Sequence, residues 1–418
     1  MELYDIEERR ERVVLAGVHT GNRSHLEDCT EESMQELDLL SQTAGVEVVA
    51  RFVQNRPVID NATYVGEGKA EEIRLFCLSN EIDVVICDDE LTGSQVKNLE
   101  KIVGTRVIDR SALIMDIFAS RARTKEGKLQ VELAQLQYHL TRLAGSFTNL
   151  SRLGGGIGTR GPGETKLETD RRRIRDRITF IKKQLEEVEK TRKVQRKQRI
   201  KEGMQQVALV GYTNAGKSTL LNYLTDAGVL AEDKLFATLD PTARKLVLPD
   251  GTAVVITDTV GFIRKLPHQL IKAFRSTLEE ALIADVLIHV ADASSPNVED
   301  NIAVVENLLT DLGAAEKPVL TVFNKIDLTE GFMYSKPMSV EISANTGKNT
   351  DKMLEMICDV LPEKRHRIKI LIPYSRGDLI SEIYDSANIN YEEHTADGTL
   401  MDITADSKLF NIVSDFIV

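Results

Sequence analysis

The chain has 418 residues, 42% of them hydrophobic, and a net charge of −12 at pH 7. This length predicts two to four domains with packed cores. No run approaches the ~18 uncharged apolar residues of a membrane helix, and the charged residues 1–12 lack the apolar core of a signal peptide. We therefore expect a cytoplasmic protein with no membrane span, whose four cysteines are free thiols and not disulfides or zinc ligands.

Residues 1–125 alternate short apolar strands with helical stretches. Strands are predicted at 13–18, 46–50, 83–87 and 106–109, and helices at 31–44, 68–80 and 93–102. This alternation predicts an N-terminal α/β subdomain with a parallel sheet. The turn-like sequence 66–69 resembles a phosphate-binding loop but lacks the full motif, so we interpret it as the start of a helix.

Residues 126–203 carry two stripes of apolar residues at heptad spacing. The stripes are Leu129, Leu133, Leu136, Leu140 and Leu143, and then Leu167, Ile174, Ile178, Ile181, Leu185 and Val188. Such spacing predicts two long helices that pack on each other. The stretch Ala144–Lys166 between them is rich in glycine and is predicted not to be helical. We interpret the region as an antiparallel coiled-coil hairpin with a glycine-rich loop at its tip.

The same region is basic. Residues 121–202 contain 22 Lys and Arg against 10 Asp and Glu, a local charge of +12, which leaves −24 for the rest of the chain. A basic segment on an acidic body favours a polyanionic partner, although a charge run is more often a solvated helix face. The clusters Arg171–Arg173, Arg175, Arg177 and Lys190–Lys201 are our candidates for contacts with RNA phosphates.

Residues 204–363 form a second predicted α/β domain, and residues 364–418 a small C-terminal α+β module. In the first, strands are predicted at 207–210, 253–256, 286–290, 319–323 and 340–342, with a hairpin turn at Asp250-Gly251. In the module, a strand at 368–372 is followed by a helix after Gly377-Asp378 and by strands around Ile389 and Met401.

The second α/β domain contains a phosphate-binding loop that fits GxxxxGK[ST]. It lies between an apolar strand and a helical stretch at 219–225, and consists of Gly211, Tyr212, Thr213, Asn214, Ala215, Gly216, Lys217 and Ser218, with Thr219 next. Glycines allow backbone N–H groups to surround phosphates, and the following helix presents its positive end. We expect Lys217 to reach the β- and γ-phosphates and the Ser218 hydroxyl to bind Mg²⁺.

Three further motifs follow predicted strands in order. They are Asp258-Thr259-Val260-Gly261, then Asn324-Lys325-Ile326-Asp327, and finally Ser343-Ala344-Asn345. In the first, the carboxylate serves the metal's water shell and the Gly261 N–H bonds the γ-phosphate. The Asp327 carboxylate can accept from N1–H and the 2-amino group of guanine, which adenine does not offer, so the nucleotide is predicted to be GTP.

A switch threonine should lie between the first two motifs, in residues 235–242. Such a threonine gives its hydroxyl to Mg²⁺ and its backbone N–H to the γ-phosphate. We choose Thr238, with Thr242 as the alternative. The nucleotide-contacting stretch is then predicted as Phe236, Ala237, Thr238, Leu239 and Asp240.

The motifs GYTNAGKST, LFATLDPT and DTVGF, together with the glycine-rich loop at 153–168, resemble the HflX family of translation-factor-class GTPases. The resemblance covers essentially the whole chain. It implies a GTPase that binds the large ribosomal subunit and its rRNA and helps to split stalled ribosomes, with Ser218 and Thr238 as Mg²⁺ ligands. The alternatives are a ribosome-assembly GTPase, or a GTP-dependent switch that binds a protein partner through its coiled coil. We expect the protein to be a monomer.

The residue after Gly261 is Phe262, where many GTPases have a glutamine that orients the attacking water. A phenyl ring cannot hold water by hydrogen bonds. Catalysis is therefore assigned to Lys217, Thr238 and Gly261 with Mg²⁺, and intrinsic turnover is predicted to be slow until a partner completes the site.

Overall fold

The computed structural model describes residues 9–21, 23–24, 28–145, 162–201, 204–225, 235–236, 241–267, 270, 280–329, 331–332, 334, 336–362, 366–405 and 407–418. The chain divides into two compact units. Unit 1 comprises Met1–Lys190, Glu232–Asp240 and Val260–Leu278. Unit 2 comprises Thr191–Ala231, Pro241–Thr259 and Glu279–Val418.

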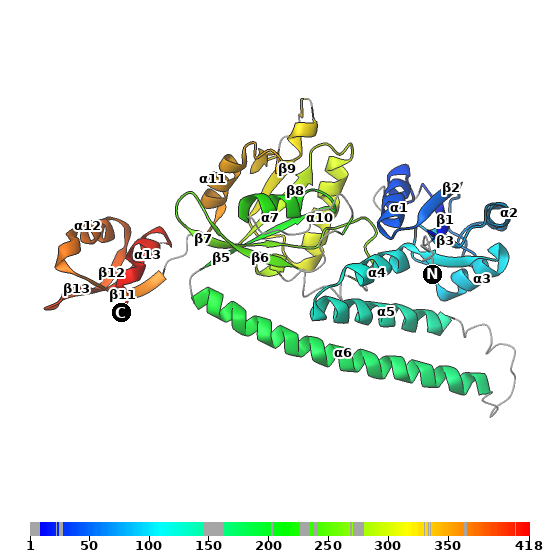
Figure 1. The fold of residues 1–418 in the computed structure, drawn as a ribbon, viewed down its shortest axis with the longest axis horizontal. Helices are drawn as coiled ribbons and strands as arrows, with labels where there is room; N and C mark the ends of the chain where they lie inside the picture. Colours follow the sequence, from blue (N-terminus) through cyan, green and yellow to red (C-terminus); the bar gives the residue numbers. More distant parts are fainter. Residues whose placement is uncertain are drawn as a thin grey trace, which may run out of the picture. The chain divides into compact units, whose positions relative to one another are not determined.

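Unit 1 is built on a four-stranded parallel sheet (Figure 1). The order across the sheet is β2 (Glu47–Asn55), β1 (Arg12–His19), β3 (Val84–Cys87) and β4 (Arg106–Asp109). The helices are α1 (Glu31–Thr43), α2 (Glu67–Asn80), α3 (Gly93–Val103) and α4 (Arg110–Arg121). The predicted parallel α/β layer is confirmed, although α4 was not identified from sequence.

Both faces of this sheet are buried. Along β1, Val13 and Leu15 belong to one apolar cluster, together with Leu37 of α1 and Phe118 of α4. Their neighbours Val14 and Ala16 belong to a second cluster that includes residues of α2 and α3. Successive strand residues point to opposite faces, so a strand covered on both sides is apolar throughout. This explains why β1 has no alternation of polar and apolar residues.

The helices have clear start signals. Thr30 caps α1 by accepting from the Ser33 amide, and Thr92 with Gln95 forms a capping box at α3. At α2 the N-cap is Gly66 and Lys69 pairs with Glu72 at 2.7 Å, so the turn-like sequence 66–69 begins a helix.

Two long helices complete the N-terminal part of the chain, α5 (Lys125–Gly145) and α6 (Pro162–Lys201). They run alongside each other (Figure 1), and the heptad positions Leu129, Leu133, Ile178 and Ile181 form a shared buried cluster. An Arg177–Glu132 ion pair of 2.7 Å joins their exposed sides.

One prediction about these helices was wrong. The stretch Ala144–Lys166 was expected to be non-helical throughout, but α5 extends to Gly145 and α6 begins at Pro162. Proline is well suited to the first helical position, because its φ is already near the helical value and its missing N–H is not needed there.

Unit 2 contains a six-stranded sheet in the order β10, β9, β8, β5, β7, β6. The strands are β5 (Gln205–Gly211), β6 (Thr242–Val247), β7 (Ala253–Asp258), β8 (Val286–Asp292), β9 (Val319–Asn324) and β10 (Ser339–Glu341). Only β6 is antiparallel to its neighbour, and Gly251 turns the β6–β7 hairpin at φ +85°. The helices are α7 (Lys217–Thr225), α10 (Val298–Leu312) and α11 (Thr350–Val360).

The C-terminal module is a three-stranded antiparallel sheet with two helices. Its sheet has the order β11 (His366–Ile372), β13 (Thr399–Ala405) and β12 (Asn388–His394). The helices α12 (Gly377–Ser386) and α13 (Ser407–Val413) contribute to one apolar core with this sheet.

All four cysteines are free thiols, as expected. In the part of the chain that the structure describes, no helix is long and apolar enough to cross a membrane.

Candidate functional site

The phosphate-binding loop follows the central strand of the unit 2 sheet. Strand β5 is buried along its whole length and lies between β8 and β7. After β5 the chain forms β6 and β7 on one side of β5 and then crosses to β8 on its other side, which makes the carboxyl end of β5 a topological switch point. Ligands of open α/β sheets bind at such points.

Two glycines of the loop have geometry that excludes a side chain. Gly211 has φ +155°, and a Cβ there would lie 2.2 Å from the Val290 carbonyl oxygen. Gly216 has φ +91°, and a Cβ there would lie 2.2 Å from Asn324 Nδ2. Glycine is therefore required at both positions, because the loop passes close to Val290 of β8 and to Asn324 at the end of β9.

Lys217 begins α7 and its side chain is buried. Its Nζ donates to the carbonyl oxygens of Gly211 at 3.1 Å and Tyr212 at 2.9 Å. Burial lowers the pKa of Lys217 to about 8, against the opposing effect of the nearby Asp258 carboxylate. The Asp258 charge does not offset the burial of the ammonium, so a phosphate beside it would stabilise its charged form, as expected of a phosphate-binding lysine.

Ser218 and Asp258 meet although they are 40 residues apart. The Ser218 Oγ donates to Asp258 Oδ2 at 2.6 Å, and Asp258 ends the buried strand β7. Next to it, Thr259 Oγ1 donates to the Leu209 carbonyl of β5 at 2.6 Å, which ties the two strand ends together.

Asn324 connects two motifs. It is 2% exposed at the end of β9, where its Nδ2 donates to the Ala215 carbonyl of the phosphate loop and its Oδ1 accepts from the Ala344 amide, both at 2.9 Å. The side chain thereby fixes the position of the loop relative to Ser343-Ala344-Asn345, so its role in this structure is to hold the two motifs together.

Lys325 and Asp327 have different surroundings. Lys325 adopts φ +67° and its Nζ pairs with Asp292 at 2.7 Å. Asp327 is exposed, so its carboxylate is accessible to a base. Sequence analysis did not identify Asp292, whose position at the end of β8 was the available signal.

The predicted switch residues are divided between the two units, and Asp258, Thr259 and the alternative Thr242 belong to unit 2 with the phosphate loop. Val260, Gly261 and Phe262 belong to unit 1, where Phe262 is 1% exposed. Phe236 is also in unit 1, and its ring packs edge-on against Phe118 at 4.5 Å. We did not predict this packing for Phe236. Ala237, Thr238, Leu239 and Asp240 lie outside the described residues.

Three family models match the chain in succession. They are described as GTP-binding GTPase N-terminal (residues 31–119), GTP-binding GTPase Middle Region (121–199) and 50S ribosome-binding GTPase (206–325). The chain is 48% identical to the GTPase HflX of Lacrimispora saccharolytica, over 99% of this chain and 98% of that one. The chain belongs to the HflX family of GTPases.

Other HflX proteins are similar to this chain over most of its length. Identity is 54% to the protein of Caldanaerobacter subterraneus, over 86% of each chain, and 44% to that of Escherichia coli, over 95% of this chain and 94% of that one. Among solved structures, a GTP-binding protein of Sulfolobus solfataricus in complex with GDP aligns with a TM-score of 0.43 and 23% identity, covering 84% of this chain and 98% of that chain.

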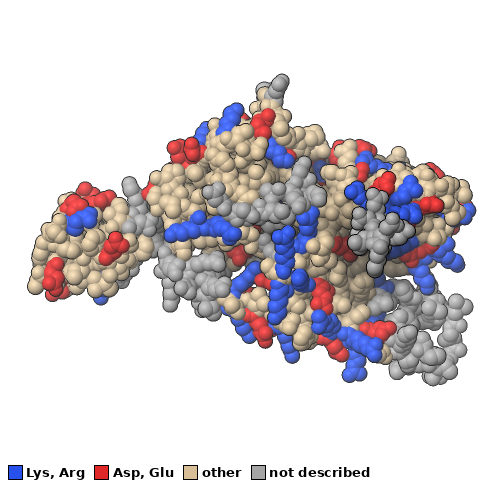
Figure 2. All heavy atoms as spheres, viewed as in Figure 1, with Lys and Arg blue, Asp and Glu red and all other residues tan. Residues whose placement is uncertain are grey.

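HflX membership confirms the fold class, GTP binding and GTP hydrolysis predicted from sequence. Figure 2 shows the charged side chains on one face of the molecule, and the described part of α6 contributes both basic and acidic residues. Arg172, Arg173 and Arg175 are all exposed there.

Proposed function

We propose that this HflX-family GTPase binds the large ribosomal subunit and its rRNA, and uses GTP binding and hydrolysis to split or rescue stalled ribosomes. The observation that carries the proposal is the joining of a GTPase domain, matched at 206–325 by a 50S ribosome-binding GTPase model, to a long basic helix. A protein that acts on polyanionic RNA needs such a surface.

The residues present fit a magnesium ion. Ser218 Oγ and Asp258 Oδ2 lie 2.6 Å apart, and hydroxyl and carboxylate oxygens are the donors that this ion prefers. Among the described residues no cluster of three or more His, Cys, Asp or Glu could hold a metal by itself, so phosphate oxygens would share in binding it. We assign Ser218 and Thr238 as ligands. When bound, Mg²⁺ neutralises charge on the phosphates.

The protein groups around the phosphates act by position and charge. We assign Lys217 to the β- and γ-phosphates, with the amides of Gly211–Thr219 around the phosphate chain. Thr238 and Gly261 are assigned to the γ-phosphate through their backbone N–H groups. The stretch Phe236–Asp240 and the motif Asp258–Gly261 would enclose this end of the nucleotide.

Guanine recognition is assigned to residues that follow β9 and β10. Asp327 would accept from the base, with Asn324 and Lys325 shaping its site. Ser343, Ala344 and Asn345 would meet the guanine oxygen through backbone N–H. Support for this assignment comes from the Asn324–Ala344 bond, which holds the two motifs in one place.

Hydrolysis in this protein would depend on its partner. Phe262 is buried and apolar, so it cannot orient water, and we assign that task to a group that the ribosome supplies or reorders. GTP turnover should therefore rise when large subunits are added. Equal turnover with and without subunits would contradict this part of the proposal.

The RNA contact is testable with matched charge changes. Replacing Arg171, Arg172 and Arg173 by Ala should weaken co-sedimentation with large subunits and lower the salt slope of binding by about 0.7–0.9 per lost phosphate contact. The control replaces Lys97, Lys101 and Arg106 by Ala. These exposed residues of the α3–β4 region carry the same total charge as the three arginines of α6. If both triple variants bound alike, α6 would not be the RNA-contacting surface.

Ribosome splitting needs its own assay. Light scattering of intact ribosomes should fall when the protein and GTP are added, and sucrose gradients should show free subunits. Binding to large subunits without any splitting would favour an assembly GTPase, and absence of binding would favour a switch that acts on a protein partner. Light scattering of the protein alone should give the mass of a monomer.

A further inference from the structure

A cluster of buried charges lies at the carboxyl ends of β1 and β3 in unit 1. Asp88 and Asp89 directly follow β3 and are 0% and 9% exposed. Asp88 accepts from Ser33 Oγ at 2.8 Å and pairs with Arg110 at 2.9 Å. Asp89 accepts from Tyr64 OH at 2.8 Å and pairs with Arg23 at 2.9 Å.

The cluster brings several buried carboxylates together. They are Asp28, Glu36, Asp88 and Asp89, and among the described residues of the N-terminal domain they pair with Arg23, Arg110 and His19. Buried carboxylates are costly unless paired, so a further cation beside Asp88 and Asp89 stabilises this arrangement. Burial works against ionisation of Asp88, but Arg110 and Lys265 outweigh it and hold the pKa of Asp88 below its ordinary value.

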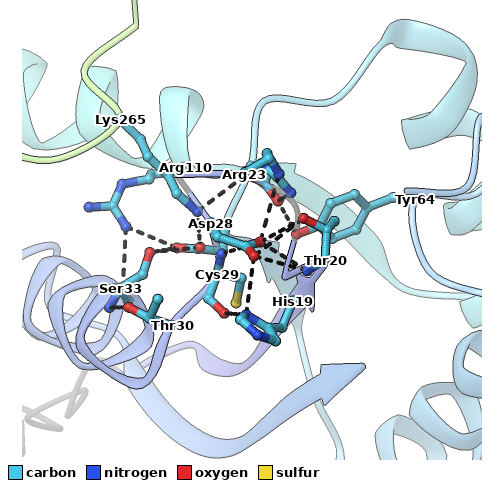
Figure 3. Close-up of polar contacts among 12 residues, drawn as sticks. His19, Thr20, Arg23, Asp28, Cys29, Thr30, Ser33, Tyr64, Arg110 and Lys265 are labelled. Atoms are coloured by element: carbon cyan, nitrogen blue, oxygen red, sulfur yellow. Dashed lines mark hydrogen bonds and ion pairs between the residues drawn. The ribbon is translucent and has the colours of Figure 1, made fainter. Parts of the chain in front are cut away.

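Lys265 provides that cation, and it comes from far along the chain. Its Nζ donates to Asp88 Oδ2 and lies 3.2 Å from Asp89 Oδ1, with the lysine side chain 10% exposed. Figure 3 shows Lys265, Arg110 and Ser33 converging on the same group of carboxylates. Lys265 follows the DTVG motif by four residues, so the ion pair joins a nucleotide-site segment to the N-terminal domain within unit 1.

The backbone at Lys265 is held in an unfavourable conformation. Its φ is +52°, in the left-handed region that a lysine rarely adopts. Such conformations persist where surrounding contacts impose them, and they gather at switch regions. The ion pairs of Lys265 with Asp88 and Asp89 are contacts of this kind.

Apolar packing fixes the same segment. Val260, Ile263 and Leu270 belong to the buried cluster of α1 and α4, together with Leu235 and Phe236. Both segments that flank the nucleotide motifs therefore contribute to the core of unit 1. Lys265 differs from the apolar anchors because its partners are two specific carboxylates, which fix the segment at one place along the sheet edge.

We infer that Lys265 is a positioning residue that couples the nucleotide site to the N-terminal domain through its ion pairs with Asp88 and Asp89. Gly261 is assigned to the γ-phosphate, and only three residues separate it from Lys265. A change at the γ-phosphate that shifts this segment must then strain the ion pairs of Lys265 with Asp88 and Asp89. If the ion pairs hold the segment in place, the affinity for the nucleotide is lower instead. This inference rests on the assigned role of Gly261, but it does not depend on the ribosome as partner.

The test measures nucleotide-dependent hydrogen exchange in the full chain with GDP and with a non-hydrolysable GTP analogue. In the unaltered protein, peptides covering residues 31–37 and 84–89 should exchange at different rates in the two states. In Lys265→Met with Asp89→Asn this difference should shrink about fivefold or more, within the usual range of coupling between sites. The double variant removes one cation and one carboxylate, so the charge balance of the cluster is kept.

Two further variants make the result specific. Lys265→Arg keeps the cation and should keep the nucleotide-dependent difference, and Lys97→Met, an exposed lysine on α3, should leave it unchanged. Retention of the full difference in the double variant, or no difference in the unaltered protein, would overturn the inference. If the unaltered protein did not bind the GTP analogue, the assigned nucleotide site would be wrong. Titration with the analogue therefore distinguishes failure of the proposed site from failure of the coupling.

Discussion

Asn324→Ala is expected to lower both the stability of the GTPase domain and its affinity for the nucleotide. The side chain makes one bond to the Ala215 carbonyl and one to the Ala344 amide, each 2.9 Å long, at a position that is 2% exposed. Alanine leaves a buried acceptor and a buried donor without their partners. The substitution therefore affects the phosphate loop and the Ser343–Asn345 motif at once.

The size of the effect follows from the two lost bonds. Leaving a buried polar group unsatisfied costs about 1–3 kcal/mol, so the pair predicts a stability loss of about 2–6 kcal/mol. If about 2 kcal/mol of this is lost from the free energy of nucleotide binding, the affinity falls about 30-fold, since about 1.4 kcal/mol is a factor of ten. Asn324→Asp keeps an acceptor for the Ala344 amide but places a carboxylate oxygen against the Ala215 carbonyl, so it should also lose stability.

Titration with a fluorescent GDP analogue measures the affinity, and denaturant unfolding measures the stability. The control is Asn301→Ala in the same unit, because Asn301 Nδ2 makes only a 3.4 Å contact with Ser295 Oγ. The control should lose less than about 1 kcal/mol, as expected for a long, part-exposed contact. Affinity of Asn324→Ala within twofold of the unaltered protein, with an unchanged unfolding midpoint, would refute the reasoning.

Three further outcomes follow from the structure. Gly216→Ala should lower nucleotide affinity by about 5- to 150-fold, because backbone strain of about 1–3 kcal/mol accompanies a side chain at φ +91°; isothermal titration would show this. Nucleotide affinity should fall by up to about tenfold per pH unit above pH 8. The reason is that Lys217, with a pKa of about 8, loses in the unliganded protein the proton that binds phosphate. The nucleotide affinity of Lys217→Arg should not change from pH 7 to 9. Ile181→Ala, at a fully buried position between α5 and α6, should cost about 2–5 kcal/mol. Arg177→Ala, at an exposed ion pair, should change stability little, because solvent screens such pairs; denaturant unfolding separates the two.

The sign of the pH dependence is fixed by the direction of the Lys217 shift. Burial lowers the pKa of this lysine in the folded protein, so between pH 8 and the ordinary lysine value the unfolded chain binds more protons. In that window the contribution of Lys217 to stability without nucleotide increases with pH, while its contribution to phosphate binding decreases. A bound nucleotide should therefore stabilise the protein most below pH 8.

Sequence was sufficient to place the strands and loops of the nucleotide site. Buried parallel strands appear as short apolar runs, and phosphate and base motifs must follow such strands, so the two signals confirm each other. Strand β5 and the loop that follows it are an example, because the run Val207–Val210 and the motif Gly211–Ser218 are adjacent. The helices α4, α10, α11 and α13 were not predicted. At α4 no loop separates strand from helix, because Asp109 is both the last residue of β4 and the N-cap of α4.

Sequence could not predict where the segments around the switch motifs pack. Leu235, Phe236 and Ile263 are isolated apolar residues in loops, and loop residues have no periodicity from which a buried face can be read. The Lys265–Asp88 pair joins residues 177 positions apart, and each residue taken alone is typical of a solvated surface. Only the fold shows that Asp88 is buried and that Lys265 pairs with it. These ion pairs and the apolar packing of Ile263, neither of which has a local pattern, together place the segment after the DTVG motif with the N-terminal domain.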